Sequence, residues 1–425
     1  MQKNYRKSDI GTPKNTYEIQ KKSLGLSSQL LQFQKMVYTL QLGEKTLKFP
    51  NPEITLWVDD VEKYQLVQDH FETLIEYLLD EYVIINFKKG TKIQSQSIQP
   101  IVPYEYDYLS LFSGGLDSIA IPFLTNYSGK NGILHHTITH PIPQGKAIVI
   151  FNKYFKSTKK QTLVTSTNKN KVEDPAYLKT RGLIFLTNAL CVASELNIPE
   201  VIIPENGPFM INFPVSASTD PTRTTDPFMM ETLTKIFNHV TDSNIIITTP
   251  FKDMTKSEVI LSSGNDSLIQ DTWSCSYFQG KSNMCGMCNS CLVRILSCYA
   301  IDEGENLEQF YEINPFDVDP SVLGNRNQRN YSISEDTATF CRSILNPNTL
   351  NDIEKEKFSN LQKMYPILCN YALDLMLGFQ NLSVRYRSTQ PIFTHFKKML
   401  DYIDPNLLET RRLQLMQQKS DFGWM

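Results

Sequence analysis

Six consecutive residues in the first third of the chain combine groups that could hold a phosphate. They are Ser113-Gly114-Gly115-Leu116-Asp117-Ser118. Glycine lets backbone N–H groups approach a ligand closely, and the start of a helix offers further unpaired N–H donors, so the loop predicts an anion site. A carboxylate fits such a site only if a divalent cation bridges it to phosphate oxygens, so Asp117 predicts bound Mg²⁺.

An ordinary tight turn between a strand and a helix would also use two glycines. The flanking residues favour a nucleotide loop, because Leu109, Leu111 and Phe112 form an apolar run and helical spacing begins at Ile119. The sequence contains no G-x-x-x-x-G-K-[ST] string, which excludes a Walker loop. We therefore predict that Ser113, Gly114, Gly115, Asp117 and Ser118 bind a nucleotide.

Four cysteines have the spacing of a metal site. Cys275, Cys285, Cys288 and Cys291 are arranged as C-x9-C-x2-C-x2-C. Four thiolates complete a tetrahedral zinc shell with no position left for water, so we predict a structural zinc ion. An iron–sulfur cluster, which also takes four cysteines, and unmetallated core thiols are the alternatives. The remaining cysteines lie in apolar helical contexts and are predicted to be inert: Cys191, Cys298, Cys341 and Cys369.

One cation lies where a helix is predicted to begin. Thr255 is a predicted N-cap with Glu258 as its capping-box partner, which puts Lys256 in the first helical turn. The helix dipole disfavours a cation there, and a nearby phosphate would explain it. Arg181 is a similar case, with a surface ion pair as the alternative. We predict that Asp117, Lys256 and Arg181 are catalytic, the two cations stabilising phosphate charge during attack.

Two further groups of polar residues follow predicted strands. His135, His136 and His140 lie near one strand end, and a role in lining the nucleotide pocket is favoured over metal binding, because alternation points neighbours to opposite faces. A long loop after another strand is predicted to form the substrate-side wall, a solvated surface loop being the alternative. The substrate-binding candidates in it are Asn206, Asp220 and Arg223.

The elements that must position these residues alternate between strand and helix. Strands are predicted at 107–112, 132–139, 162–165, 200–203 and 244–249, with helices between them, one of which covers 175–196. This order predicts an α/β fold with a doubly wound parallel sheet, in which ligands bind at the carboxyl ends of the strands.

Four regions are predicted along the chain: a polar tail at 1–28, a small α+β domain at 29–104, a nucleotide-binding core with the metal site at 105–300, and a helical region at 301–425. In the second region, strands at 54–58 and 83–87 flank one helix whose apolar face holds Tyr64, Val67, Phe71, Leu74 and Leu78. In the last, one helix is predicted to bury Leu361, Met364, Leu368, Tyr371 and Leu375, and another Phe393, Phe396, Met399 and Leu400.

Composition limits the class of protein. The chain has 425 residues, of which 41% are hydrophobic and 20% charged, as in an ordinary globular protein of two or three domains. A net charge of -3 argues against nucleic acid as a partner. No apolar run has transmembrane length, and the first residues lack the apolar core of a signal peptide, so we predict a cytoplasmic protein without membrane contact. In a cytoplasmic protein, cysteines are expected to bind metals or react as thiols rather than to form disulfides.

The loop at 113–118 resembles the SGGxDS loop of the ATP pyrophosphatases, the PP-loop superfamily, which implies ATP and Mg²⁺. The Arg181 helix, the run from Pro250 to Glu258, and the T-W-S-C…C-G-x-C-x-x-C…R pattern ending at Arg294 follow in the order seen in 7-cyano-7-deazaguanine synthases. That resemblance covers about residues 107–300. It implies a ligase that adenylates 7-carboxy-7-deazaguanine, adds ammonia, and dehydrates the amide to a nitrile.

The chain departs from that family around the substrate. His140-Pro141-Ile142-Pro143 stands where the family has Tyr-Gly-Gln-x-His, and only Asp220-Pro221-Thr222-Arg223 remains of Tyr-Pro-Asp-Cys-Arg. Synthase-like proteins with extra terminal regions resemble those of anti-phage defence operons, the Qat and type IV CBASS systems. A partner protein from the same operon and a homodimer are the interactions this resemblance implies. The rival functions are a tRNA thiolase of the same superfamily and a non-catalytic nucleotide-binding subunit.

Overall fold

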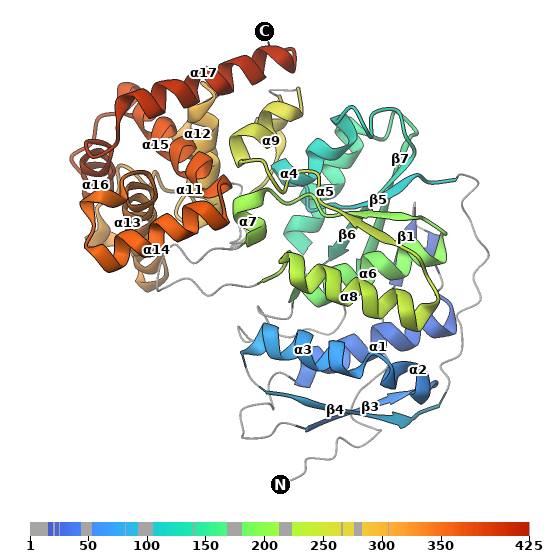
Figure 1. The fold of residues 1–425 in the computed structure, drawn as a ribbon. Helices are drawn as coiled ribbons and strands as arrows, with labels where there is room; N and C mark the ends of the chain where they lie inside the picture. The colour runs from blue at the N-terminus through green and yellow to red at the C-terminus, as the bar shows by residue number, and fades with distance from the viewer. Residues whose placement is uncertain are drawn as a thin grey trace.

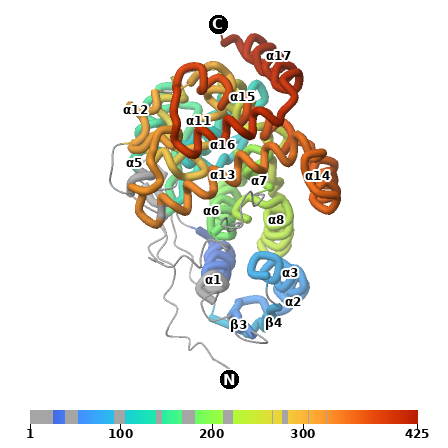
Figure 2. The backbone as a smooth tube through the Cα atoms, turned by 90° about the vertical axis from the view of Figure 1, so that its left-hand side faces the viewer, coloured from blue at the N-terminus to red at the C-terminus, as the bar shows by residue number. Residues whose placement is uncertain are grey.

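The computed structural model describes residues 16–19, 22–24, 26–43, 53–80, 82–91, 105–138, 141–167, 181–211, 223–264, 267–275, 283–304 and 306–424. The central sheet lies between the N-terminal elements, drawn in blue, and a group of C-terminal helices, drawn in orange and red (Figure 1). The turned view again places the blue N-terminal elements at one end of the molecule and the orange and red C-terminal helices at the other (Figure 2). None of the described helices is both long and apolar enough to cross a membrane.

Within the described residues, the sheet has seven strands in the order β2-β1-β7-β6-β5-β8-β9. Five neighbouring strands are parallel: β5 (Tyr108–Leu111), β6 (Gly132–Ile138), β7 (Gln161–Thr167), β8 (Glu200–Ile202) and β9 (Ile246–Thr248). The predicted α/β fold with a parallel sheet is therefore confirmed. The strand order reverses direction at β5, and the carboxyl end of a strand at such a switch point is where open α/β sheets bind ligands.

Two short strands extend this sheet at one edge. β1 (Thr16–Ile19) and β2 (Lys22–Leu24) are antiparallel, and β1 pairs with β7, for example Thr16 with Thr167. They lie within the stretch for which the sequence predicts only a polar tail. Three or four residues are too few to show an alternating pattern, so the backbone of β7, and not local sequence, is what specifies these strands.

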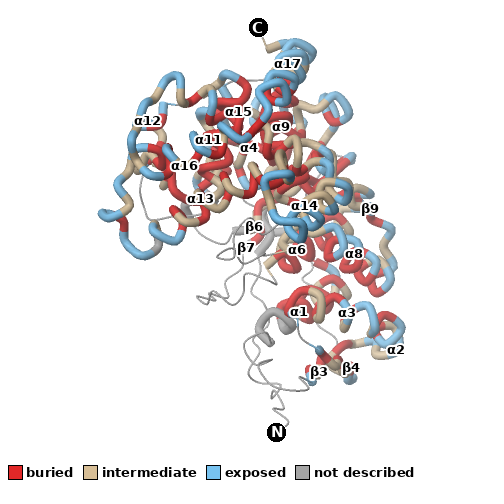
Figure 3. Tube along the Cα trace, turned by 60° about the vertical axis from the view of Figure 1, so that its left-hand side comes forward, coloured by how far each residue is buried: buried red, intermediate tan, exposed pale blue. Residues whose placement is uncertain are grey.

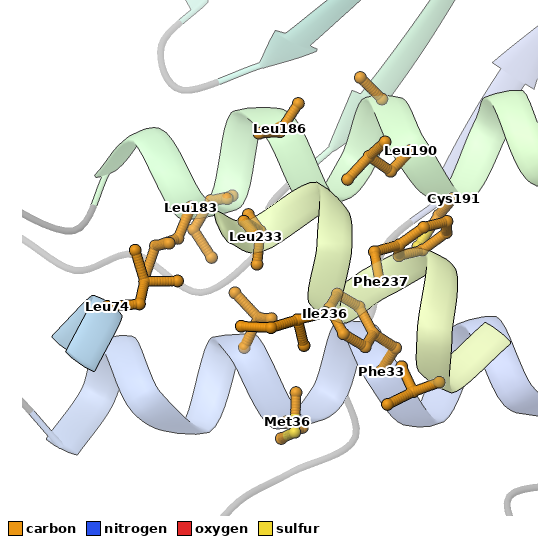
Figure 4. Packing of buried hydrophobic residues seen from close by; sticks show 14 of the residues in the cluster. Phe33, Met36, Leu74, Leu183, Leu186, Leu190, Cys191, Leu233, Ile236 and Phe237 are labelled. Carbon is orange, nitrogen blue, oxygen red and sulfur yellow. The ribbon is translucent and has the colours of Figure 1, made fainter. Parts of the chain in front are cut away.

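Helices cover both faces of the sheet. On one face, α6 (Arg181–Glu195) and α8 (Pro227–Thr241) pack with α1 (Ser28–Gly43) around buried apolar side chains (Figure 4). On the other face lie α4 (Leu116–Ala120), α5 (Pro141–Tyr154) and α9 (Lys256–Ser262). Neighbouring side chains of a strand point to opposite faces of the sheet, so each strand contributes to both cores. In β6, Ile133 lies in the core with α1, α6 and α8, and Leu134 lies in the core with α4 and α5.

The N-terminal elements pack against the first of these faces. β3 (Glu53–Val58) and β4 (Ile84–Lys89) form a parallel pair. The sequence predicts a single helix between these strands, and this prediction is wrong. The chain forms two helices, α2 (Val61–Gln65) and α3 (Gln68–Leu79), with a break at Leu66 and Val67. The break turns Leu66 outward, where it is 74% exposed, while Tyr64 and Phe71 stay buried as predicted.

The C-terminal region is helical. Its elements are α11 (Asn289–Ala300), α12 (Leu307–Phe310), α13 (Asn325–Leu345), α14 (Asp352–Met364), α15 (Ile367–Arg385), α16 (Pro391–Leu400) and α17 (Pro405–Asp421). Burial is concentrated in α11, α13 and α15, and the outer side of α17 is exposed (Figure 3). The predicted single helix joining Leu361 to Leu375 is wrong, since Pro366 separates α14 from α15 and leaves Met364 65% exposed.

Candidate functional site

The glycine loop joins β5 to α4 at the switch point of the sheet. Gly114 has φ +78°, and a Cβ there would come within 3.0 Å of the Ala147 backbone on α5, so only glycine fits. The Ser118 hydroxyl accepts a hydrogen bond from the Ser113 amide (3.2 Å) and donates to the Gly115 carbonyl (3.0 Å). The loop is thus held in one shape before a ligand arrives.

Three side chains from different elements meet directly beyond this loop. Lys256 Nζ of α9 lies 2.7 Å from Asp117 Oδ2 of α4, and the two side chains are only 11% and 10% exposed. The Asn206 amide, which follows β8, donates to the same carboxylate oxygen at 3.0 Å. The structure therefore brings together the predicted catalytic residues Asp117 and Lys256 and the predicted substrate residue Asn206. Phe209 covers the ammonium of Lys256, with 5.9 Å between Nζ and the ring centroid.

Glu205 is an ionisable group of this site that the sequence prediction left out. Burial raises the pKa of its carboxyl to about 8, the negative charge of Asp117 adds to the rise, and Lys256 and Arg181 oppose it. Glu205 is half-buried: protein atoms surround most of its side chain, which keeps some contact with solvent. The rule that functional groups follow strand ends would have found it, because it comes three residues after β8.

Arg181, the other predicted catalytic cation, is placed near this group. It begins α6, and burial lowers the pKa of its guanidinium, whereas the charge of Glu205 raises it. Its Nε makes no hydrogen bond to any residue that the structure describes. A buried N–H donor without a hydrogen-bond partner costs free energy, and an anionic ligand that accepts its hydrogen bond would remove that cost.

The site fits the divalent cation implied by its carboxylate. Asp117 Oδ1 is buried and receives no hydrogen bond from the amide, hydroxyl or ammonium groups of the described residues. Carboxylate oxygens are the ligands that Mg²⁺ prefers, together with water and substrate phosphate. Asp117 can therefore hold a magnesium ion through Oδ1 while Oδ2 stays paired with Lys256 and Asn206.

The histidines near the loop are buried. His136 Nδ1 lies 2.7 Å from the carbonyl oxygen of Phe112, which fixes the proton on Nδ1 and leaves Nε2 as an acceptor. Burial lowers the pKa of His135 to about 3, and neither of its ring nitrogens has a partner among the described residues. The pocket-lining role predicted for the two stays a prediction, and His140 lies outside the described residues.

The predicted substrate-side wall is only partly described. Asp220 lies outside the described residues. Arg223 contacts the N-terminal elements, with NH2 at 3.0 Å from Asp80 Oδ1 and its guanidinium 4.4 Å from the centroid of the Tyr77 ring. The structure therefore places Arg223 against α3 and its C-cap Asp80. Its substrate role stays a prediction from sequence.

The four spaced cysteines converge on one point. The sulfur atoms of Cys275, Cys285, Cys288 and Cys291 all lie within 4.8 Å of one another. A tetrahedral zinc ion with Zn–S bonds of about 2.3 Å holds its sulfurs about 3.8 Å apart, and the Cys285–Cys291 pair is at 3.9 Å. In a four-iron cluster each cysteine binds a different iron, so such close sulfurs favour a single ion.

Local structure builds this metal centre. Gly286 has φ +78°, and a Cβ there would collide with the Ile313 carbonyl oxygen at 1.8 Å. Close contact among the four thiols lowers the pKa of Cys285, with Cys275 as the first cause, and raises the pKa values of Cys288 and Cys291. The other cysteines, Cys191, Cys298, Cys341 and Cys369, lie buried or half-buried outside the cluster.

Comparison with known proteins identifies one segment. Residues 144–300 match the family of the queuosine biosynthesis protein QueC, a PP-loop fold; the match covers less than half of the 425 residues. It includes Arg181, Lys256 and the four cysteines, but begins after the glycine loop. No match was found among curated proteins or among solved structures. The match supports the QueC-like resemblance and, with it, ATP-dependent ligase chemistry.

Proposed function

We propose that the chain is an ATP-dependent ligase that activates a carboxylate as an acyl-adenylate and transfers it to an amine. The observation that carries this proposal is the pairing of Lys256 Nζ with Asp117 Oδ2 at 2.7 Å, at the carboxyl end of β5 and beside the glycine loop. An anion loop, a buried carboxylate for Mg²⁺ and a buried cation are the groups that adenylate formation needs.

The reaction has two steps. A carboxylate oxygen of the substrate attacks the α-phosphorus of ATP, and pyrophosphate leaves with its bonding electrons. The amine nitrogen then attacks the acyl carbon, AMP leaves, and the amine loses a proton. Bound Mg²⁺ would neutralise phosphate charge and help pyrophosphate to leave.

Each residue of the site has a role in this scheme. Ser113, Gly114, Gly115 and Ser118 hold the pyrophosphate. Asp117 holds Mg²⁺, and Lys256 and Arg181 stabilise the negative charge that develops on the phosphates. The Glu205 carboxyl, with a pKa of about 8, is mostly protonated at neutral pH, so it can donate a hydrogen bond within the site.

For the substrate we propose a 7-deazaguanine that carries a carboxylate, such as 7-carboxy-7-deazaguanine. The partial QueC match supports this choice. Asn206, at 3.0 Å from Asp117, is close enough to the reacting centre to orient the acid, and Asp220 and Arg223 are assigned by sequence alone. We assign the cysteine cluster to a structural zinc ion, since four thiolates leave no open position for chemistry.

The amine is either ammonia or an amine of a partner protein. Ammonia would give the amide and then, with a second ATP, the nitrile. A protein amine would give a secondary amide that cannot form a nitrile. The departures from the family pattern at 140–143 and 220–223 and the added terminal regions support a macromolecular acceptor, such as the N-terminus of a protein encoded beside this one in a defence operon.

The experiment combines the purified chain with ATP, Mg²⁺, 7-carboxy-7-deazaguanine and, in turn, each protein encoded beside it. The intact mass of every protein is then measured. A partner that gains the mass of the acid less water supports conjugation. Free 7-cyano-7-deazaguanine formed from ammonia, with all protein masses unchanged, supports synthesis of the small molecule instead. Tight ATP binding without pyrophosphate release in any of these mixtures contradicts the ligase proposal and favours a non-catalytic nucleotide-binding subunit.

A further inference from the structure

The helix that carries Lys256 is held at its first turn by a side chain from the other end of the chain. Thr255 caps α9, with its hydroxyl accepting from the Glu258 amide at 3.3 Å and its own amide donating to the Glu258 carboxylate at 2.7 Å. Arg411 of α17 donates from NH2 to Glu258 Oε1 at 2.9 Å. The cap next to Lys256 is therefore bonded to a residue about 150 positions further along the sequence.

A second acidic residue closes these bonds into a ring. Asp374 of α15 accepts from Arg411 Nε through Oδ1 at 2.7 Å, and its other oxygen accepts from the Thr255 hydroxyl. The side chains of Arg411 and Asp374 are 2% and 1% exposed. Buried charges of this kind are held firmly in one geometry, because any displacement leaves a charge unpaired in a medium of low polarity.

The far end of α9 is fixed by the same C-terminal segment. Trp424 Nε1, just beyond α17, donates to the Leu261 carbonyl oxygen at 2.9 Å. The α9 helix is only seven residues long, so contacts at both ends determine its position. Figure 1 shows α9 between α17 and α4, the element that carries Asp117.

We propose that Arg411 and Asp374 are positioning residues, which set the first turn of α9 so that Lys256 Nζ reaches Asp117. A lysine has a long flexible stem, and the dipole of α9 disfavours its charge at this end, so the pairing with Asp117 requires an outside constraint. The C-terminal helices thereby form part of the machinery that assembles the site. The geometric claim stands by itself, and only its consequence for catalysis rests on the proposed function.

The test measures the reactivity of Lys256 in the full-length protein, with no nucleotide present. Acetylation under native conditions, followed by peptide mass spectrometry, gives the labelling rate of Lys256 relative to the exposed Lys153. Arg411→Lys keeps the charge but cannot bridge Asp374 and Glu258 as a guanidinium does. The matched control is Arg412→Lys, since Arg412 lies beside Arg411 but pairs with Glu409 on the surface.

Arg411→Lys should raise the relative labelling rate of Lys256 about tenfold, and Arg412→Lys should leave it unchanged. Lys419 of α17, bonded to Glu303 at 2.6 Å, reports whether α17 stays docked and should not change. An unchanged Lys256 rate in folded Arg411→Lys would overturn the proposal. So would an equal rise at Lys256 and Lys419, since that means α17 has simply detached.

A second pair of variants decides the question if Arg411→Lys does not fold. Asp374→Asn removes the charge that pairs with Arg411 but leaves the capping box of Thr255 and Glu258 in place, and Asp401→Asn makes the same change at an exposed position. Labelling of Lys256 should rise in Asp374→Asn and stay at the wild-type rate in Asp401→Asn; equal rates in the two would overturn the proposal.

The catalytic consequence is measured separately, in the same variants. If the wild type releases pyrophosphate, Arg411→Lys should lower kcat by about tenfold or more with the KM for ATP nearly unchanged. An unchanged kcat in a variant whose Lys256 labelling has risen would contradict the catalytic part of the proposal. If the wild type releases none, the proposed function fails, but the labelling result still decides whether Arg411 positions Lys256.

Discussion

The backbone amide of Trp273 donates to the carbonyl oxygen of Gly114 at 3.3 Å. This bond joins the segment that enters the cysteine cluster to the middle of the glycine loop, since Cys275 follows two residues later. Arg294 strengthens the link, because its buried guanidinium donates to the Thr272 carbonyl at 3.1 Å. The metal centre and the loop are therefore mechanically connected.

Loss of the metal should therefore weaken nucleotide binding as well as stability. We expect the purified protein to contain about one zinc ion per chain with no visible absorbance. Cys288→Ser should remove the zinc, lower the melting temperature and weaken ATP binding by isothermal titration. Cys341→Ser makes the same change at a buried thiol outside the cluster and should keep its zinc. Iron with labile sulfide in place of zinc would contradict the assignment and favour the thiolase alternative.

The features that sequence predicted best are local ones. The turn at Ser113–Ser118 and the capping box of Thr255 and Glu258 involve neighbours in the chain, and the structure has both. The strands could be located because short apolar runs, such as Val201 and Ile202 in β8, mark them. The fold class followed from their alternation with helices.

The features that sequence missed depend on contacts between distant residues. The raised pKa of Glu205 arises first from burial by other elements and then from the charge of Asp117, and the bonds of Arg411 to Asp374 and Glu258 join three helices. The helix break before Pro366 was overlooked because apolar spacing continues across it, although proline marks the boundary.

The glycine loop should not tolerate a side chain at its second position. Gly114→Ala must hold alanine at a positive φ and against Ala147, which should cost about 1–3 kcal/mol of unfolding free energy and weaken ATP binding by about tenfold or more. Gly145→Ala in the neighbouring α5 is the control, because its Cβ would meet nothing within 4 Å and helical alanine is favourable. Equal ATP affinity in both variants would argue against the loop as the nucleotide site.

Stability should fall as the pH falls below neutrality. Burial, aided by the charge of His136, lowers the pKa of His135 to about 3 from an ordinary 6.5. Between these values the unfolded chain binds a proton that the folded chain does not, so each pH unit costs up to about 1.4 kcal/mol. His136 acts in the same direction, since burial also lowers its pKa.

Urea unfolding at pH 5 and pH 7.5 tests this dependence. His135→Leu removes the titrating ring and should reduce the difference in unfolding free energy between the two pH values. His70→Gln is the control, because His70 lies exposed on α3 and its loss should leave the difference unchanged. An identical pH dependence in wild type and His135→Leu would show that His135 does not carry the effect.

The most direct measurement of the central claim is pyrophosphate release from ATP, with Mg²⁺ and 7-carboxy-7-deazaguanine present, by the wild type and three variants. Asp117→Asn and Lys256→Met should each lower the rate about 100-fold or more, since each removes charge that acts on the phosphates. Lys153→Met removes an exposed ion pair with Asp271 and should keep the wild-type rate. Carboxylate-dependent release at the wild-type rate by folded Asp117→Asn would contradict the account.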